Sequence, residues 1–273
     1  MNSNTTGRSA INIASPGHVA FAALMIWLGV LGLIKRDFTV NWQPIPTGVP
    51  AREVLVYLCS VVSLACGVGL LWRKSAALAA RVLLAFLILW FLLWRIHGLF
   101  VLPFVASTWS CGQTLVMTSA AWVLFVWFAT EWDRQRLGFA TGDTGLRIAR
   151  LLYGLGLIPF GIAHFMYPKE TIVLIPGWLP WHVFWAYFTG ATFIVAGLAV
   201  LIGVFARLAV TLSALQMALF GLLVWLPRIA GGTPMSAFQW GEVVMNVALI
   251  AAAWVVTDSY RGTPWFAVRS KFK

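Results

Sequence analysis

Ile45-Pro-Thr-Gly-Val-Pro50 recurs as Ile175-Pro-Gly-Trp-Leu-Pro180, and both prolines of the motif are repeated after the same shift of 130 positions. The same shift pairs further residues of one type, namely Tyr57 with Tyr187, Gly67 with Gly197 and Leu71 with Leu201. Gly112 and Gly241 also correspond, with a shift that is shorter by one position. The sequence therefore predicts a duplicated unit, although the two copies differ at most of their polar positions.

The composition places the chain in a lipid bilayer. Hydrophobic residues make up 61% of the 273 residues and charged residues only 10%, a balance that no water-soluble core of this size requires. Most of the apolar runs approach the roughly 20 residues that a helix needs to cross about 30 Å of hydrocarbon. We therefore predict eight membrane-spanning helices, near residues 19–34, 54–72, 82–105, 114–130, 148–166, 183–206, 208–226 and 243–256. The first and last runs are short, so these helices must extend into flanking polar residues.

Lys and Arg residues divide unevenly between the two sides of these spans, with thirteen on one side and six on the other. Loops rich in Lys and Arg stay in the cytoplasm, so both chain ends are predicted to be cytoplasmic and both Pro-rich loops to face outside. Residues 1–17 are polar with Arg8 as their single charge, and no small-residue cleavage site follows the first apolar run. We therefore expect no removable signal peptide.

The number of spans also predicts how the two units are related. Four spans return the chain to its starting side, so both units must share one orientation, with an axis along the membrane normal. The predicted fold is an all-α integral membrane protein of eight transmembrane helices, arranged as two parallel-repeat four-helix bundles. The predicted segments are a polar cytoplasmic N-terminus (1–17), a first four-helix unit (18–137), a cytoplasmic linker (138–147), a second four-helix unit (148–259) and a basic cytoplasmic tail (260–273).

Motifs that indicate a reaction are scarce. The net charge of +11 comes from bases scattered over short loops, which favours anionic lipid headgroups over nucleic acid as the counter-charge. No CxxC pair, metal-ligand spacing, nucleotide-binding loop or nucleophile elbow occurs, so no metal, cofactor or enzyme class is indicated. Cys59 and Cys66 lie too far apart on one helix to form a disulfide, while a bridge between Cys59 and Cys111 stays open.

The second unit contains the main candidate ligand site, because an ionisable side chain within a span needs a partner, a cavity or nearby headgroups. Glu242 is expected in the first turn of the eighth helix, where the helix N-terminus favours a carboxylate, with Asn246 one turn further on. His164 and Tyr187 are expected at a similar depth, and Arg228 is a candidate to neutralise Glu242. Together they would form an outer pocket. The alternative is that each faces headgroups, backbone or lipid.

The first unit contains a secondary set of candidates. Arg95 and His97 lie near the outer end of the third helix, Gln113 occupies the position that matches Glu242, and Tyr57 matches Tyr187. This set has no obvious acid partner, so it would attract an anion or a quinone carbonyl. The alternative is that its bases extend along the apolar surface to the headgroups.

One stretch of the second unit carries a family resemblance. It consists of Gly154-Leu-Gly-Leu-Ile-Pro-Phe-Gly-Ile-Ala-His164-Phe-Met-Tyr-Pro168, then Ile175-Pro-Gly-Trp-Leu-Pro180, then Trp185-Ala-Tyr-Phe-Thr-Gly190 and Gly197. These residues resemble the four-helix membrane proteins called DoxX or DoxX-like, over residues 147–258. The resemblance implies a bacterial inner-membrane protein, linked in some relatives to sulfur or thiol oxidation, including the small subunit of a thiosulfate:quinone oxidoreductase. It carries over no catalytic residue.

These observations lead to one hypothesis and two alternatives. We expect a non-catalytic accessory subunit, surrounded by the lipid bilayer, that binds a small apolar molecule such as a quinone. A redox partner protein would supply the electrons, since no ligands for haem, flavin or iron–sulfur are found in the sequence. The alternatives are a small-molecule permease or exporter with a cavity between the two units, and a purely structural membrane scaffold.

Overall fold

The computed structural model describes residues 11, 13–38, 41–43, 45, 48–101 and 104–268, so Pro46 of the first Pro-rich loop lies outside the described residues. The described part of the chain contains eight helices that are long and apolar enough to cross a membrane, which confirms the predicted all-α, multi-pass membrane fold. The spans are α1 (Pro16–Lys35), α2 (Arg52–Leu71), α3 continued by η1 and α4 (Ala76–Trp90, Phe91–Arg95 and Ile96–Val101), α5 (Phe104–Phe128), α7 (Gly142–Met166), α9 (His182–Ile202), α10 continued by η3 and α11 (Ala206–Phe220, Gly221–Trp225 and Leu226–Ala230) and α12 (Ala237–Asp258). The short connecting helices are α6 (Glu131–Arg136), η2 (Gly138–Ala140) and α8 (Pro168–Ile172).

Three spans begin earlier than their apolar runs predicted. α3 begins at Ala76 instead of near 82, α5 at Phe104 instead of near 114, and α7 at Gly142 instead of near 148, whereas α12 begins at Ala237 because its short apolar run extends into flanking polar residues, as expected. The added turns contain small and polar residues, which lower the mean hydropathy although they still belong to the helix. α12 starts with a capping box in which Ser236 and Gln239 each accept a hydrogen bond from the other's backbone N–H. Because α7 begins at Gly142, the last residues of the linker predicted at 138–147 belong to this helix.

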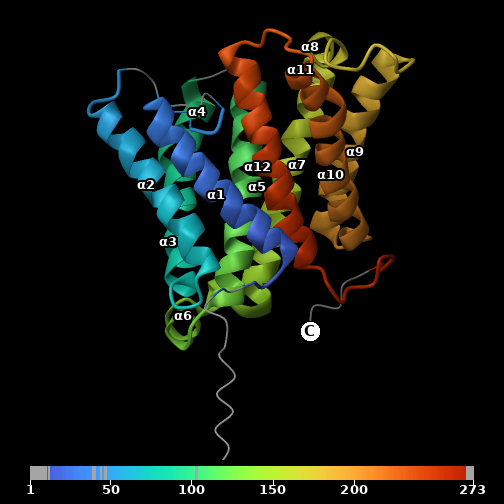
Figure 1. Ribbon diagram of the computed structural model, residues 1–273. Helices are drawn as coiled ribbons and strands as arrows, with labels where there is room; N and C mark the ends of the chain where they lie inside the picture. Colours follow the sequence, from blue (N-terminus) through green and yellow to red (C-terminus); the bar gives the residue numbers. More distant parts are fainter. Residues whose placement is uncertain are drawn as a thin grey trace, which may run out of the picture.

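The first half of the chain contains α1 to α5 and the second half α7 to α12, and the two are in contact where α5 packs against α7 and α12 and where α1 packs against α12 (Figure 1). In the first half α1 packs on α2, α2 on α3 and α3 on α5, and in the second half α7 packs on α9, α9 on α10 and α10 on α12. Contacts of α5 with α7 and α12, and of α1 with α12, join the halves, and α5 and α12 are the most buried spans. α4, α8 and α11 lie at one end of the molecule, called the upper end below, and α6 lies at the lower end (Figure 1).

Several element bounds follow the same shift of 130 positions as the proline pairs. α3 and α10 begin 130 positions apart, and each runs into a π-helical segment, Phe91–Arg95 in η1 and Gly221–Trp225 in η3. π-Helix is rare in proteins, so two such segments at matched positions are informative. The residues before α2 and α9, Ala51 and Trp181, both adopt a left-handed backbone, with φ of 55° and 58°.

A glycine allows the first two spans of each half to pack closely. A Cβ atom on Gly67 of α2 would lie 2.7 Å from the Ala22 carbonyl oxygen of α1. A Cβ atom on Gly197 of α9 would likewise lie 2.7 Å from the Gly154 carbonyl oxygen of α7. Since backbone atoms cannot yield as a flexible side chain can, any larger residue would push the helices apart.

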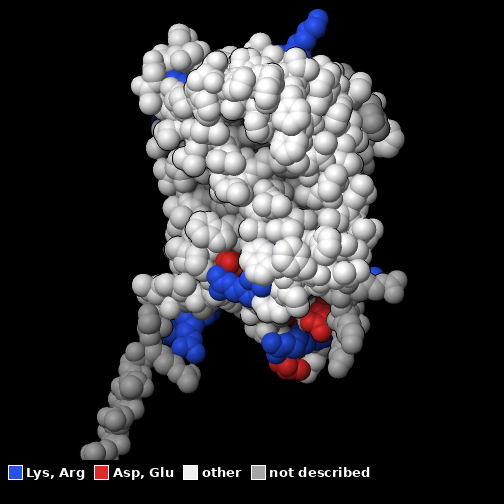
Figure 2. Space-filling view, turned by 90° about the vertical axis from the view of Figure 1, so that its right-hand side faces the viewer, with Lys and Arg blue, Asp and Glu red and all other residues white. Residues whose placement is uncertain are grey.

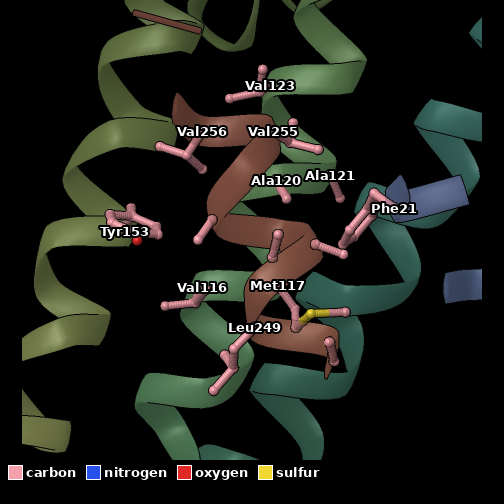
Figure 3. Packing of buried hydrophobic residues seen from close by; sticks show 14 of the residues in the cluster. Phe21, Val116, Met117, Ala120, Ala121, Val123, Tyr153, Leu249, Val255 and Val256 are labelled. Carbon is pink, nitrogen blue, oxygen red and sulfur yellow. The ribbon is translucent and has the colours of Figure 1, made fainter. Parts of the chain in front are cut away.

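The main apolar core fills the space where α1, α5, α7 and α12 come together. Phe21, Met117 and Val256 belong to this core and are fully buried (Figure 3). Tyr153 of α7 is buried in the same cluster, and its hydroxyl lies 2.8 Å from the Ser213 hydroxyl of α10. A buried phenol needs such a partner, because an unsatisfied hydroxyl in an apolar core is costly.

Charged residues gather toward the ends of the spans. The middle of the face in Figure 2 shows no Lys, Arg, Asp or Glu, whereas both signs of charge appear near its lower end. At the lower end Arg81 of α3 donates two hydrogen bonds, of 2.8 and 2.9 Å, to the fully buried Asp133 carboxylate of α6. Burial alone would raise the pKa of Asp133, but the hydrogen bonds from Arg81 and Thr130 and the Arg81 charge lower it to about 2.

Candidate functional site

Four polar residues from both halves of the protein meet near the upper ends of α5 and α12. They are Asn41 in the α1–α2 loop, Arg95 in η1, Thr114 in α5 and Glu242 in α12, and we call them the upper polar cluster. Asn41, Arg95 and Thr114 are buried, and Glu242 is partly buried. Polar and ionisable residues at such depth in a membrane protein are costly and typically serve function.

Glu242 lies further along its helix than the sequence predicted. α12 begins at Ala237, and no acid lies in its first turn, so the expected stabilisation of Glu242 by the helix N-terminus was wrong. The Glu242 Oε1 atom instead accepts a hydrogen bond from Asn41 Nδ2, its one hydrogen-bond partner among the described residues. None of the ion pairs within the described ranges involves Glu242. A carboxylate has about four acceptor positions, so Asn41 satisfies only part of them.

Asn41 connects the two halves. Its side-chain Nδ2 bonds Glu242 and lies 3.5 Å from the Phe238 carbonyl oxygen, both on α12. A Cβ atom on Gly241 would come within 3.1 Å of Asn41 Cγ, so the glycine leaves room for the amide. The backbone oxygen of Asn41 accepts a hydrogen bond of 2.9 Å from Arg95 Nη2 in the first half. A single loop residue thus stands between an acid and a base from opposite halves.

Arg95 is a buried guanidinium without a carboxylate partner. Only 3% of Arg95 is exposed. Its Nε donates to the Thr114 hydroxyl at 2.8 Å, and its Nη2 donates to the Asn41 and Trp42 carbonyl oxygens at 2.9 and 3.2 Å. All eight acidic residues of the chain are described, and none forms an ion pair with Arg95. Neutral oxygens therefore accept the described hydrogen bonds of Arg95 Nε and Nη2, and Asn41 links Arg95 to Glu242.

The position of Arg95 has a counterpart of different chemistry in the second half. Arg95 ends the π-helical segment η1, and Trp225 ends the matching segment η3. Both residues are buried, at 3% and 7% exposure. π-Helical segments often occur at functional sites. The matched position therefore holds a cation in the first half and an indole in the second.

His164 is not joined to Glu242. Its Nδ1 donates a hydrogen bond of 2.7 Å to the Phe160 carbonyl oxygen one turn earlier on α7. Its ring packs against Phe193 of α9 and Phe220 of α10, with centroid distances of 5.8 and 6.1 Å. An aromatic environment and a backbone acceptor thus account for its contacts, and no proton relay between His164 and Glu242 is seen in the described part of the chain.

Arg228 and Asn246 likewise have other partners. Arg228 Nη2 donates a hydrogen bond of 2.9 Å to the Val173 carbonyl oxygen in the turn after α8, and no ion pair with Glu242 is found in the described segments. The expected neutralisation of Glu242 by Arg228 was therefore wrong. Asn246 is buried, and its Nδ2 donates a hydrogen bond of 3.1 Å to the Met217 carbonyl oxygen of α10. Asn246 thus fastens α12 to α10.

The remaining predicted residues do not gather at one place. Tyr187 packs its ring against Phe165, with centroids 5.4 Å apart, and stays 39% exposed. Tyr57 is exposed to a similar degree, and His97 is exposed as well. Gln113 is buried. Of the secondary set, Arg95 alone contributes to the upper polar cluster through a described hydrogen bond.

The described residues contain neither a disulfide nor a cluster of side chains that could bind a metal ion. Cys59, Cys66 and Cys111 are buried free thiols, so the disulfide between Cys59 and Cys111 is not formed. The Cys111 thiol instead lies 3.6 Å from the Arg95 carbonyl oxygen. Within the ranges that the structure describes, no group of three His, Cys, Asp or Glu residues is placed to hold a metal ion.

Two surface hollows lie away from the predicted pocket. One of about 320 Å³ runs between α1 and α12 at mid-span and is lined by Ala20, Ala23, Leu24, Trp27, Val247, Ile250, Ala251 and Trp254. The other, of about 590 Å³, is open and follows the loop that precedes α9, along Gly177 and Leu179–Phe184. Both are lined mainly by apolar residues, as expected for surfaces that face lipid.

No family model, curated protein or solved structure matches this chain. Its own features define its class: a multi-pass membrane protein with eight candidate spans, whose two halves share one buried polar cluster.

Proposed function

We propose that this protein is a DoxX-like accessory subunit of a bacterial inner membrane, which binds a small apolar molecule with a polar head, such as a quinone, for a redox partner protein. The lower end, where α1 begins and α12 ends, is proposed to face the cytoplasm because most Lys and Arg residues fall on that side. The two halves are proposed to be duplicated four-helix units. This is supported by the shared shift of the proline motifs and of the π-helical segments η1 and η3.

Glu242 carries the proposal. An acid within a span costs about 2.5–3.5 kcal/mol on insertion scales, and such residues are retained mainly where they bind or relay something. Glu242 has one described hydrogen-bond partner, Asn41, and no cation in an ion pair among the described residues. It lies toward the upper end of the span, the depth at which a molecule dissolved in the bilayer presents its polar head.

The surroundings of Glu242 favour a ligand with a ring. Phe238, one turn before Glu242 on the same face of α12, is 51% exposed, so an aromatic side chain borders the acid. Aromatic side chains stack on flat rings and prefer the membrane–water boundary. A quinone-like molecule has a hydrogen-bonding group that suits Glu242 and a flat apolar body that suits the neighbouring aromatic side chain.

The test uses the full-length protein in lipid nanodiscs. We expect saturable binding of a tritiated short-chain quinone or of its hydroquinone. Glu242→Gln is expected to weaken the affinity for whichever of the two binds more tightly about tenfold, as for loss of a hydrogen bond to a charged group. Glu170→Gln, which alters an exposed acid of α8 at the same end, should leave binding unchanged. Absence of saturable binding, or equal losses in both variants, would contradict the ligand. Oxidoreductase activity of the isolated protein would contradict the accessory role.

A permease is the second candidate, favoured by one observation. Arg95 and Glu242 come from opposite halves and meet through Asn41, so charged groups lie where the halves would move against each other in alternating access. Proteoliposomes that take up a solute with wild-type protein, and lose uptake with Glu242→Gln while Glu170→Gln stays active, would support this candidate over the accessory subunit.

A further inference from the structure

The described residues that follow α12 are fastened to the start of α10. The Phe205 backbone N–H donates a hydrogen bond of 2.8 Å to the Ala267 carbonyl oxygen, and Arg207 Nη1 donates one of 2.8 Å to the Thr263 carbonyl oxygen. The guanidinium carbon of Arg207 also lies 4.0 Å from the centre of the Trp265 ring, a cation–π contact. Phe205 directly precedes α10, a candidate membrane span, so these contacts keep the segment at the depth where the span begins.

This segment exposes apolar side chains at the lower end of the protein, outside the helix bundle (Figure 1). Phe266 and Val268 are 73% and 67% exposed, and Trp265 is 42% exposed. Phe205 is partly exposed and packs edge-on against Phe266, with ring centroids 6.1 Å apart. We call Phe205, Trp265, Phe266 and Val268 the lower apolar patch. Neighbouring exposed apolar side chains mark a contact surface.

Positive charge without acids accompanies the lower apolar patch. Residues 259–273 contain no Asp or Glu and four bases, Arg261, Arg269, Lys271 and Lys273. Asp258 offsets the charge of Arg261 through an ion pair of 2.8 Å. The other three bases fall within five residues of Val268, a length of chain that reaches at most about 18 Å. Their charges therefore stay near the patch.

Two occupants suit an apolar patch beside positive charge, namely an acidic partner protein and an anionic bilayer surface. The depth of the patch favours the bilayer, because the hydrogen bond between Phe205 and Ala267 holds it level with the start of α10. The bilayer already surrounds the protein at this depth, so binding costs no further translational freedom. Apolar insertion and attraction of bases to anionic lipids together hold a segment on a membrane surface.

We propose that the lower apolar patch and the basic chain end after it bind the bilayer surface through anionic phospholipid headgroups. Phe266 and Val268 enter the boundary between headgroups and acyl chains, and the bases pair with the lipid phosphates. The segment thereby holds the start of α10 and the end of α12 on one leaflet. This inference goes beyond the proposed function and does not depend on it, because neither Glu242 nor its ligand takes part.

The test measures how well water reaches the chain end in the full-length protein. Ser270→Cys carries a fluorophore, while the three native thiols are buried, and the protein without Ser270→Cys supplies the labelling blank. The protein is placed in nanodiscs of phosphatidylcholine alone or with about one third phosphatidylglycerol, which is anionic. We expect a neutral water-soluble quencher to act at least about fivefold less with the anionic lipid, since each base near such a surface contributes roughly that factor. About 1 M salt should remove the difference, because it screens these charges.

Two triple variants test whether the chain end itself is responsible. The first removes its last three bases, as Arg269→Gln, Lys271→Gln and Lys273→Gln. It should bring quenching in the two kinds of nanodisc within about twofold of each other. The control removes three exposed bases elsewhere at the lower end, as Arg73→Gln, Lys74→Gln and Arg136→Gln. It should keep the full difference, and melting temperatures near that of the wild type verify that both variants are folded.

A further variant tests the patch. Phe266→Ser combined with Val268→Ser should raise quenching in both kinds of nanodisc, because apolar insertion does not require lipid charge. Equal quenching of the wild type in the two lipids, or an equal effect of the two triple variants, would refute binding by anionic headgroups. Unchanged quenching in the patch variant would refute its insertion. None of these results bears on ligand binding at Glu242, so the two proposals fail separately.

Discussion

The Asn41 side chain donates a hydrogen bond to the Glu242 carboxylate across 201 positions of sequence. On its other side, the Asn41 carbonyl oxygen accepts a hydrogen bond from Arg95. The α1–α2 loop of the first half is therefore part of the surroundings of the acid on α12. The candidate site belongs to the junction of the halves rather than to the second unit alone.

Replacement of Arg95 should destabilise the protein more than its single charge suggests. Arg95→Ala leaves the Asn41 and Trp42 carbonyl oxygens without this donor in a buried place, which costs about 1–3 kcal/mol for each group left unsatisfied, whereas the Thr114 hydroxyl keeps its hydrogen bond to the Ser110 carbonyl oxygen. Arg95→Lys should recover only part of the loss, because an ammonium lacks the planar fork that reaches several acceptors. Thermal unfolding in detergent measures both. Arg73→Ala, on the exposed α2–α3 turn, is the control, and a loss no larger than in this control would refute the role given to Arg95.

The two matched glycines should respond alike to a methyl group. Gly67→Ala and Gly197→Ala each place a Cβ atom 2.7 Å from a backbone oxygen of the neighbouring span. Overpacking of this kind costs about 1–3 kcal/mol, so both variants should melt at clearly lower temperature. Gly138→Ala, where nothing lies within 4 Å, should not. If Gly67→Ala or Gly197→Ala melts at the wild-type temperature, the close approach of the two spans at that glycine does not contribute to stability.

The ion pair at the lower end predicts a pH dependence of stability. The pKa of Asp133 is lowered to about 2 in the folded protein, from an ordinary value of 3.8. The contribution of Asp133 is therefore fully present above about pH 4 and is lost as the pH falls toward 2. Melting curves of the wild type should show this loss, and curves of Asp133→Asn should lack it while starting from a lower melting temperature. The exposed Glu131 on the same helix supplies the control, as Glu131→Gln should keep the wild-type pH profile.

The three thiols should all be free and protected. Cys59, Cys66 and Cys111 are buried, so a maleimide reagent should label none of them in the folded protein and all three after denaturation without reductant. Intact mass spectrometry counts the labels. A denatured, unreduced protein that accepts a single label would show that two of the thiols are paired.

Much of the fold could be predicted from the sequence because it follows from local physical chemistry. Every backbone polar group in hydrocarbon needs an internal partner, so an apolar run of sufficient length becomes a helix. The eight spans were predicted on this ground and are confirmed. The starts of α3, α5 and α7 were placed too late, because small and polar residues at the ends of helices lower the hydropathy without ending the helix, while the extension of α12 beyond its short apolar run was expected. At α12 the capping box of Ser236 and Gln239 marks the start of the helix.

The candidate site was predicted in part. Glu242 and Arg95 were identified because an ionisable residue in a span is conspicuous in any sequence. Their common neighbour Asn41 was missed, since an asparagine in a polar loop is unremarkable and no spacing rule connects it to residues 54 and 201 positions away. The signal that was available is Gly241, a small residue next to Glu242 that leaves room for a group from elsewhere.

The partners of His164 and Arg228 show the same limit. Counted in residues from the ends of their spans, His164 and Arg228 were expected at about the same depth in the membrane as Glu242. This expected depth was the sole basis for predicting that they contact Glu242. The structure turns His164 toward the aromatic rings of Phe193 and Phe220, and Arg228 toward the Val173 carbonyl oxygen. Depth along a span can be counted in residues, but the direction that a side chain faces depends on how the helices are rotated and packed.

The sequence by itself determined that this chain crosses a membrane as helices, that its motifs recur after 130 positions, and which few ionisable residues lie within the spans. These properties depend on composition and on neighbours along the chain. Only the tertiary structure decided that Glu242 is paired with Asn41 and not with His164 or Arg228. The physical reason is that hydrogen bonds in an apolar interior form between groups brought together by helix packing, and the packing of α12 against the first half is a property of the whole chain.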